Sequence, residues 1–227
     1  MEILTLDVLR DLGECPQNSI IYADCLEAMK FIEDKSVDMV CSDPPYQITN
    51  CKWDLMIPLE PLWEHYKRVI KDNGAIVLTA SQPFTSMLVM SNLEMFRQAL
   101  VYTKTRGTNF FNAKKQFMKW HEDILIFYDN PPVYNPQMRP SGRVIKKIVQ
   151  KKVQNRSEGV FVKTGEKENY TYEPKDNLLY PKSILDFSGV SNEGLHPTQK
   201  PVELFEFLIR TYTNEGDLVL DLSLIHI

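Results

Sequence analysis

The stretch Val37–Tyr46 reads Val-Asp-Met-Val-Cys-Ser-Asp-Pro-Pro-Tyr and joins a short apolar run to an acid, two prolines and an aromatic residue. The run is bounded by turn-forming residues, which predicts a buried strand over Met39–Cys41. Each proline fixes its own φ and disfavours helix at the residue before it, so Asp43 and Pro44 are expected to be extended at the carboxyl end of that strand. Ligands bind at this edge in open α/β sheets.

A carboxylate, an exposed proline carbonyl and an aromatic ring suit the binding of a flat base that carries an amino group. The lone pair of an exocyclic amine is delocalised into the ring, so a catalyst has to accept its hydrogen bonds and direct the lone pair at an electrophile. Asp43 and the Pro44 carbonyl would be the acceptors, and Tyr46 would stack on the base after it is flipped from a duplex. The competing interpretation is a rigid turn that Asp43 caps.

Strands that alternate with helices surround this stretch, a pattern typical of an α/β protein with a doubly wound, mostly parallel sheet. The residues fit strands at 19–23, 37–41, 75–79, 99–103, 123–128 and 218–220 and helices at 25–32, 58–70, 84–96 and 201–212. Asp24 follows the first of these strands and Asp221 follows the last, as Asp43 follows the second.

Composition bounds the class of protein. Of the 227 residues, 43% are hydrophobic and 25% are charged, which predicts one globular domain with or without an insertion. No basic region followed by an apolar run opens the chain, and no apolar stretch approaches the length of a membrane span. The four cysteines form no C-x-x-C pair, so neither a metal nor a disulfide is expected, and the cytoplasm is the predicted location. A net charge of −4 argues against a general polyanion binder.

Four stretches together resemble a known family. Asp43–Tyr46, Asp-Pro-Pro-Tyr, matches the catalytic motif of the S-adenosylmethionine-dependent amino-methyltransferases of DNA, which modify adenine N6 or cytosine N4. Ala23–Met29 resembles the acid-ended strand before that motif, His196–Pro201 reads His-Pro-Thr-Gln-Lys-Pro, and Gly216–Asp221 matches the strand that opens the cofactor loop. This order is that of the circularly permuted group, in which the catalytic motif comes first. The resemblance covers most of the chain outside Met138–Lys182 and implies a Rossmann-like fold.

The resemblance implies transfer of a methyl group from S-adenosylmethionine to the 6-amino group of adenine in duplex DNA, in a bacterial or phage-infected cell. Asp43, Pro44 and Tyr46 would be catalytic, and Pro45 would fix the loop. Aspartate rather than serine at position 43 is more similar to the adenine-modifying members. The alternatives are methylation of the cytosine 4-amino group, a non-catalytic DNA-binding remnant, and a methyltransferase for RNA or protein.

The cofactor residues also follow from the resemblance alone. Asp24 would lie near the adenine of the cofactor, Thr198 and Lys200 near its methionine carboxylate, and Asp221 beside the cofactor loop. The structural alternative for Asp24 is a surface acid after a strand. For Thr198 it is the cap of a helix that begins near Pro201, and this role is compatible with cofactor binding.

The chain departs from the family after Asp221. The family continues with Pro-Phe-x-Gly-Ser-Gly or a close variant, whereas this chain ends in Leu-Ser-Leu-Ile-His-Ile. These six residues can be encoded by CTG TCT CTT ATA CAC ATC, which matches a transposon end used as a sequencing adapter. We therefore expect a truncated reading frame, a sheet without its last part, an incomplete cofactor site and weak cofactor affinity. A genomic clone that encodes the same tail and stop codon would contradict this expectation.

Basic residues gather in two places. The segment Met138–Lys182 interrupts the sheet pattern and is a candidate target-recognition insertion, whose first part suits DNA phosphates unless it is only a solvated face. That first part, Arg139–Arg156, carries no acidic residue, and its basic residues are Arg139, Arg143, Lys146, Lys147, Lys151, Lys152 and Arg156. A second group suits a splayed strand or a flipped base, unless its aromatic rings belong to the core. It comprises Lys104, Arg106, Lys114, Lys115 and Lys119, with Phe110, Phe111, Phe117 and Trp120.

Overall fold

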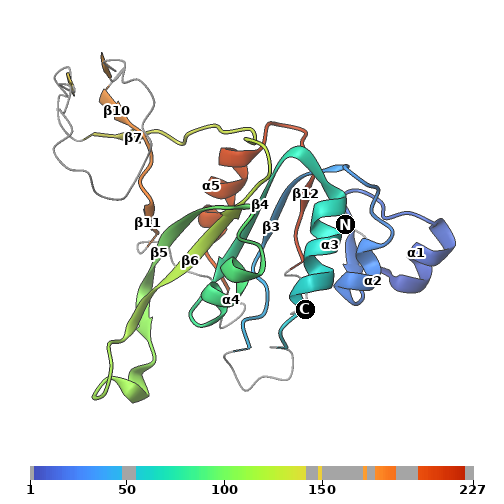
Figure 1. Cartoon of the computed structure of the whole chain (residues 1–227), viewed down its shortest axis with the longest axis horizontal. Coiled ribbons are helices and arrows are strands. Elements are labelled where there is room, and N and C mark those ends of the chain that lie inside the picture. The colour runs from blue at the N-terminus through green and yellow to red at the C-terminus, as the bar shows by residue number, and fades with distance from the viewer. Residues whose placement is uncertain are drawn as a thin grey trace. The chain divides into compact units, whose positions relative to one another are not determined.

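The structure is a computed structural model that describes residues 3–47, 55–141, 148–149, 171–172, 177–187 and 199–222 (Figure 1). The chain divides into two compact units. The larger consists of Met1–Asn135 and Lys182–Ile227, and the smaller of Pro136–Pro181. In the described part of the chain, no helix is both long enough and apolar enough to cross a membrane.

Six strands form the central sheet of the larger unit, in the order β11-β5-β6-β4-β3-β12. They are β3 (Val37–Ser42), β4 (Ile70–Ala80), β5 (Phe96–Thr108), β6 (Lys119–Phe127), β11 (Ile184–Asp186) and β12 (Val219–Leu220). Neighbours are parallel except at β6, which is antiparallel to both β4 and β5. Five strands therefore share one direction, which confirms the predicted mostly parallel sheet and puts their carboxyl ends at one edge.

Helices cover both faces of this sheet, because successive residues of a strand point to opposite faces. Val40 and Ile76 belong to a buried cluster with residues of three helices. These helices are α2 (Cys25–Met29), α3 (Leu59–Val69) and α4 (Phe84–Ser91). Their neighbours Met39 and Val77 belong to a second cluster with residues of α5 (Val202–Tyr212). The sheet is thus doubly wound, as predicted.

Helix α3 shows how the sequence specifies these layers. Its buried residues Leu62, Trp63, Tyr66 and Val69 recur at the spacing of one helix face, and Pro58 precedes its first turn. The Trp63 indole N–H is satisfied by a hydrogen bond of 2.7 Å to the hydroxyl of Ser91 at the end of α4. Apolar periodicity therefore fixes which face of α3 is buried, and one polar contact joins it to the next helix.

Two expectations from the sequence need correction. The helix predicted over 84–96 ends at Ser91, because Asn92 leaves the helical conformation (φ −151°, ψ 60°) and its N–H bonds back to the Val89 carbonyl. Strands β5 and β6 are longer than predicted and continue as a hairpin that projects from the sheet (Figure 1). Their pairing extends out to Thr108 and Lys119.

Several short elements had not been predicted. Strand β1 (Ile3–Thr5) and α1 (Leu6–Leu12) are two of them, and β1 pairs in parallel with β2 (Ile20–Tyr22), the strand predicted over 19–23. In the smaller unit, β7 (Arg139–Pro140) pairs antiparallel with β10 (Leu178–Leu179), and β8 (Ile148–Val149) pairs antiparallel with β9 (Thr171–Tyr172).

Candidate functional site

Asp43 is the first residue after β3, and the register of the sheet brings Thr79 beside it, because Ser42 pairs with Leu78 of β4. The Thr79 hydroxyl donates a hydrogen bond to Asp43 Oδ1. The Tyr46 hydroxyl donates to the same oxygen at 2.6 Å and lies 2.8 Å from Thr79 Oγ1. The Asp-Pro-Pro-Tyr turn therefore folds back on itself, with its acid and its phenol in contact.

Lys200, which precedes α5, lies against the same carboxylate. Its Nζ is 2.9 Å from Asp43 Oδ1 and 2.8 Å from Oδ2, and it also lies 3.1 Å from Glu122 Oε2 on β6. The other oxygen of Glu122 pairs with Lys104 Nζ at 2.8 Å. The four groups form an alternating chain of charge, Asp43–Lys200–Glu122–Lys104, in which the Lys200 side chain is only 9% exposed.

Two pKa shifts follow from this arrangement. Burial alone lowers the pKa of Lys200, but the charges of Asp43 and Glu122 outweigh it and raise that pKa above its ordinary value. Burial, together with the same two carboxylates, raises the pKa of Tyr46 well above its ordinary value. At neutral pH, Lys200 is therefore a cation and Tyr46 a neutral phenol that can donate to Asp43.

The rest of the turn is packed against its surroundings. Pro44 and Pro45 are both buried. The Tyr46 ring stacks on Phe84 of α4, with centroids 5.5 Å apart and planes at 23°, and Lys200 Nζ lies 5.4 Å from its centroid. The ring is therefore already held by two neighbours.

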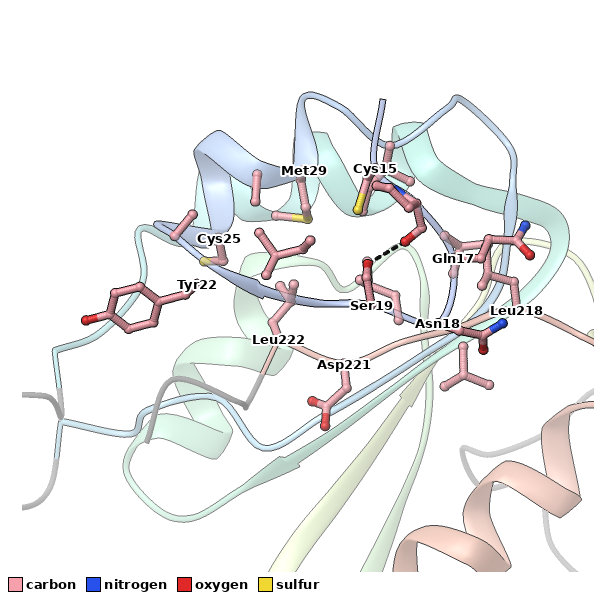
Figure 2. A pocket seen from close by; sticks show the side chains of 18 residues that line it. Cys15, Gln17, Asn18, Ser19, Tyr22, Cys25, Met29, Leu218, Asp221 and Leu222 are labelled. Atoms are coloured by element: carbon pink, nitrogen blue, oxygen red, sulfur yellow. Dashed lines mark hydrogen bonds between the residues drawn. The ribbon is translucent and has the colours of Figure 1, made fainter. Parts of the chain in front are cut away.

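A cavity of about 300 Å³ lies between β2, α2 and β12 (Figure 2). Figure 2 shows Cys25 and Met29 of α2 on one side of it and Asp221 and Leu222 on the other. Most of the lining is apolar, with few polar groups, as in many small-molecule sites, and the volume is at the low end for such sites. Burial and the nearby charge of Asp24 raise the pKa of Cys25 to about 11, so its thiol is neutral at pH 7.

The predicted cofactor residues lie in different surroundings. Asp221 lines the cavity, whereas Asp24 is not among the described residues that line it. Asp24 is instead the N-cap of α2, where its Oδ1 accepts from the N–H groups of Leu26 at 2.9 Å and Glu27 at 3.2 Å. Lys200 lies at Asp43, as described above. Thr198 falls outside the described residues.

The capping role of Asp24 predicts a specific pair of variants. Asp24→Ala is expected to destabilise the protein by about 1 kcal/mol, because two N–H groups of α2 lose their acceptor. Asp24→Ser should regain most of that loss, because serine is also a good N-cap. Urea unfolding would measure both. Equal stability of wild type and Asp24→Ala would contradict the capping role.

Sequence reasoning missed Thr79 and Glu122, and it placed Lys104 in a basic group suited to nucleic acid rather than in an ion pair with Glu122. Thr79 is the last residue of the strand predicted over 75–79, and that position was a signal that could have found it. Glu122 reaches the same edge because β6 is antiparallel, which brings its amino end beside the carboxyl end of β4. In the described part of the chain, no group of three or more His, Cys, Asp or Glu side chains could hold a metal ion.

Comparison with known proteins decides the family. Residues 37–222 match the N6_N4_Mtase family, described as DNA methylase. This chain belongs to that family. The match includes Asp43, Glu122 and Lys200, so the ion pairs around Asp43 lie within the family domain. It also includes Asp221, the acidic residue that lines the cavity.

Individual relatives agree with this assignment. The chain is 25% identical over 221 residues to the type II methyltransferase M.HpaI of Haemophilus parainfluenzae, covering 89% of this chain and 62% of that protein. It is 27% identical over 219 residues to the DNA adenine methyltransferase YhdJ of Escherichia coli, covering 89% and 70%. The chain thus spans less than two thirds of the length of M.HpaI.

A solved structure confirms the fold. The PvuII DNA methyltransferase, described as cytosine-N4-specific, superimposes with a TM-score of 0.56 at 14% identity, covering 92% of this chain and 75% of that one. At that identity the likeness bears on the fold alone. It supports the α/β architecture of this methylase family member.

Proposed function

We propose that this chain belongs to an enzyme that transfers a methyl group from S-adenosylmethionine to the 6-amino group of adenine in DNA, after the base is flipped out. The observation that carries the proposal is the Asp43 carboxylate at the carboxyl edge of the sheet, fixed by Tyr46, Thr79 and Lys200. Membership of the DNA methylase family supports it.

The proposed chemistry needs an acceptor for the protons of the amine. The Asp43 carboxylate would accept a hydrogen bond from the 6-amino group and hold its lone pair toward the electrophile. The Thr79 and Tyr46 hydroxyls would keep Asp43 Oδ1 in place while the base enters. When bound, S-adenosylmethionine supplies a methyl group made electrophilic by its sulfonium charge.

Lys200 and Glu122 would make Asp43 available to the base. In the structure, both Asp43 oxygens accept from Lys200, so an incoming amine competes with the ammonium group. Glu122 Oε2 is 3.1 Å from the same nitrogen and is a second carboxylate that can hold the ammonium as Asp43 turns to the base. Lys200 would thereby remain paired throughout, which avoids an isolated buried charge.

The residues around the cavity fit part of a nucleoside-containing cofactor. Its apolar walls suit a flat base, and the Asp221 carboxylate can accept from hydroxyl or ammonium groups. We propose Asp221 as a cofactor contact, with Asp24 shaping the site through the cap of α2. Thr198 stays a proposal from the family motif.

Residues 138–182, nearly all of which belong to the smaller unit, are our candidate for target recognition. Arg139 is described there, and its Nε donates to the Tyr180 carbonyl at 3.2 Å. The other basic residues proposed to contact DNA phosphates lie outside the described residues, namely Arg143, Lys146, Lys147, Lys151 and Lys152. The proposed partner of the whole protein is duplex DNA, and its proposed location is the cytoplasm of a bacterium or a phage-infected cell.

Adenine is the proposed target rather than cytosine for two reasons. Position 43 is aspartate rather than serine, and in this respect the motif resembles that of the adenine-modifying members of the family. The second reason is the similarity to YhdJ, whose name describes a DNA adenine methyltransferase. Methylation of the cytosine 4-amino group is the alternative.

Nucleoside analysis tests the proposal directly. The source gene, sequenced across the codon for Asp221, would be expressed in bacteria without DNA methyltransferases of their own, beside an Asp43→Ala control. The host DNA would then be hydrolysed and its nucleosides separated by mass spectrometry. We expect N6-methyladenine with the wild type and none with the control. Detection of N4-methylcytosine instead would show that cytosine, not adenine, is the target. Absence of both methylated bases would favour the DNA-binding remnant.

A further inference from the structure

The hairpin formed by β5 and β6 ends in a tip, residues 104–120, whose aromatic side chains face solvent. Phe111 is 100% exposed and Phe117 is 99% exposed, while Phe110 and Trp120 are 73% and 53% exposed. The sequence left open whether these rings belong to the core, and their exposure excludes that. Exposed apolar groups gathered at one place mark an interaction site more often than single ones do.

The charge of the tip indicates what it contacts. It carries five basic residues and no acidic one, although the whole chain has a net charge of −4. Lys104 is used internally, in its ion pair with Glu122, but Arg106, Lys114 and Lys115 are exposed. Positive charge interleaved with exposed aromatic rings suits a polyanion whose bases can stack, which is a nucleic acid.

The position of the tip relates it to Asp43. Strand β5 runs in the same direction as β3 and β4, so it leaves the sheet at the edge where Asp43 lies (Figure 1). Lys104, where the tip begins, pairs with Glu122, and these two residues end the series of alternating charges that begins at Asp43. A duplex that presents its base to Asp43 therefore lies at the edge from which the tip projects.

The tip has a defined conformation. Asn109 adopts a left-handed conformation (φ 70°) that starts the 3₁₀ turn Phe110–Asn112, and Asn112 Nδ2 donates to Asn109 Oδ1 at 2.7 Å. The Trp120 ring lies so close to Gly107 that an added Cβ there would be 2.5 Å from Trp120 Nε1. The two strands are thus held together below the exposed rings, which favours insertion of a preformed wedge.

We propose that the hairpin tip is a wedge for DNA, with Phe111 and Phe117 stacking on bases exposed beside the flipped adenine. Arg106, Lys114 and Lys115 hold the flanking phosphates. This inference rests on the proposed function, because it takes duplex DNA as the substrate. Stacking on the tip offsets the base stacking that is lost when the target leaves the helix.

Binding to damaged duplexes tests the wedge without knowledge of the recognition sequence. The probes are two fluorescein-labelled 25-mer duplexes of the same mixed sequence, one fully paired and one with a single abasic site. A wedge binds the abasic duplex more tightly, because little stacking has to be broken there. We expect anisotropy titrations to show about a tenfold preference of the wild type for the abasic duplex.

The Phe111→Ala/Phe117→Ala variant is expected to lose this preference and to keep its affinity for the paired duplex within about threefold. Lys114→Gln/Lys115→Gln should weaken binding to both duplexes and reduce the slope of log K against log salt by about two. The matched control is Met90→Ala/Leu93→Ala, which removes exposed apolar side chains outside the hairpin and should behave as wild type. Circular dichroism would confirm that each variant folds.

The outcomes separate the wedge from the proposed function. A preference for the abasic duplex that survives in Phe111→Ala/Phe117→Ala, or that is absent in the wild type while DNA still binds, overturns the wedge alone. No binding to either duplex overturns the wedge and contradicts a DNA substrate as well.

Discussion

Asparagine in place of Asp43 is expected to lower the rate of methyl transfer by about 10²- to 10⁴-fold. The amide has nearly the same shape but presents one acceptor oxygen and an NH₂ group, which would face the amino group of the base donor to donor. It also removes the negative charge that pairs with Lys200. Single-turnover kinetics on unmethylated DNA, with the product read as N6-methyladenine, would measure the loss.

Two further variants make this result specific. Asp7→Asn removes an exposed carboxylate on α1, which is distant from Asp43 in the sequence, and should leave the rate of methyl transfer unchanged. Thr79→Val keeps the charge of Asp43 but removes one hydrogen bond to Oδ1, so an intermediate loss is expected. If Asp43→Asn binds DNA and retains the wild-type rate, Asp43 does not act on the amine.

Methionine in place of Lys200 is expected to destabilise the protein by about 3–5 kcal/mol. The Lys200 ammonium lies within 3.1 Å of two carboxylates, Asp43 and Glu122, whose side chains are 22% and 12% exposed. Without it, two partly buried negative charges lose the cation between them. Lys200→Arg, which keeps the charge, should recover part of the loss, and urea unfolding would measure each.

The control for Lys200 is an exposed ion pair. Arg10→Met breaks the contact with Asp7 on α1, where both side chains are more than half exposed, and should change stability by about 0.5 kcal/mol or less. If Lys200→Met lowers the stability no more than Arg10→Met does, the stabilising role of the buried Lys200 pairs is contradicted.

The same comparison has a predicted pH dependence. Because the pKa of Lys200 is raised in the folded protein, its contribution is fully present below the ordinary value of 10.5 and is lost as pH rises through the folded pKa. The difference in the free energy of unfolding between wild type and Lys200→Met should therefore be constant from pH 7 to 9 and become smaller in strongly alkaline solution.

Much of the fold could be predicted from the sequence, because its signals are local. Short apolar runs ending in Asp43 and Asp221 predicted β3 and β12, and the periodicity around Trp63 predicted α3. The direction of β6 could not be predicted, since an apolar run does not reveal whether its neighbours are parallel. The β5–β6 pairing beyond the sheet was missed for a related reason, because residues 104–120 have no alternating apolar pattern.

The site was predicted in part. The position of the Asp-Pro-Pro-Tyr turn at the carboxyl end of a strand could be predicted, because the apolar run and the two prolines are visible in the sequence. The partners of Asp43 were not visible, because Thr79, Glu122 and Lys200 come from distant parts of the chain and meet only through the sheet register and the approach of α5. Asp24 shows the opposite case, in which a residue assigned from a motif has a local capping role.

The reversed strand β6 links the interior of the protein to its surface. One end of the β5–β6 hairpin carries Glu122 into the interior, and the other end stands in solvent with Phe111 at its extremity. Between these two ends the pairing of β5 with β6 changes register between Thr103 and Thr108 and resumes at Thr108 with Lys119. One hairpin therefore supplies both a carboxylate that helps to hold the Lys200 ammonium beside Asp43 and the exposed aromatic rings of the tip.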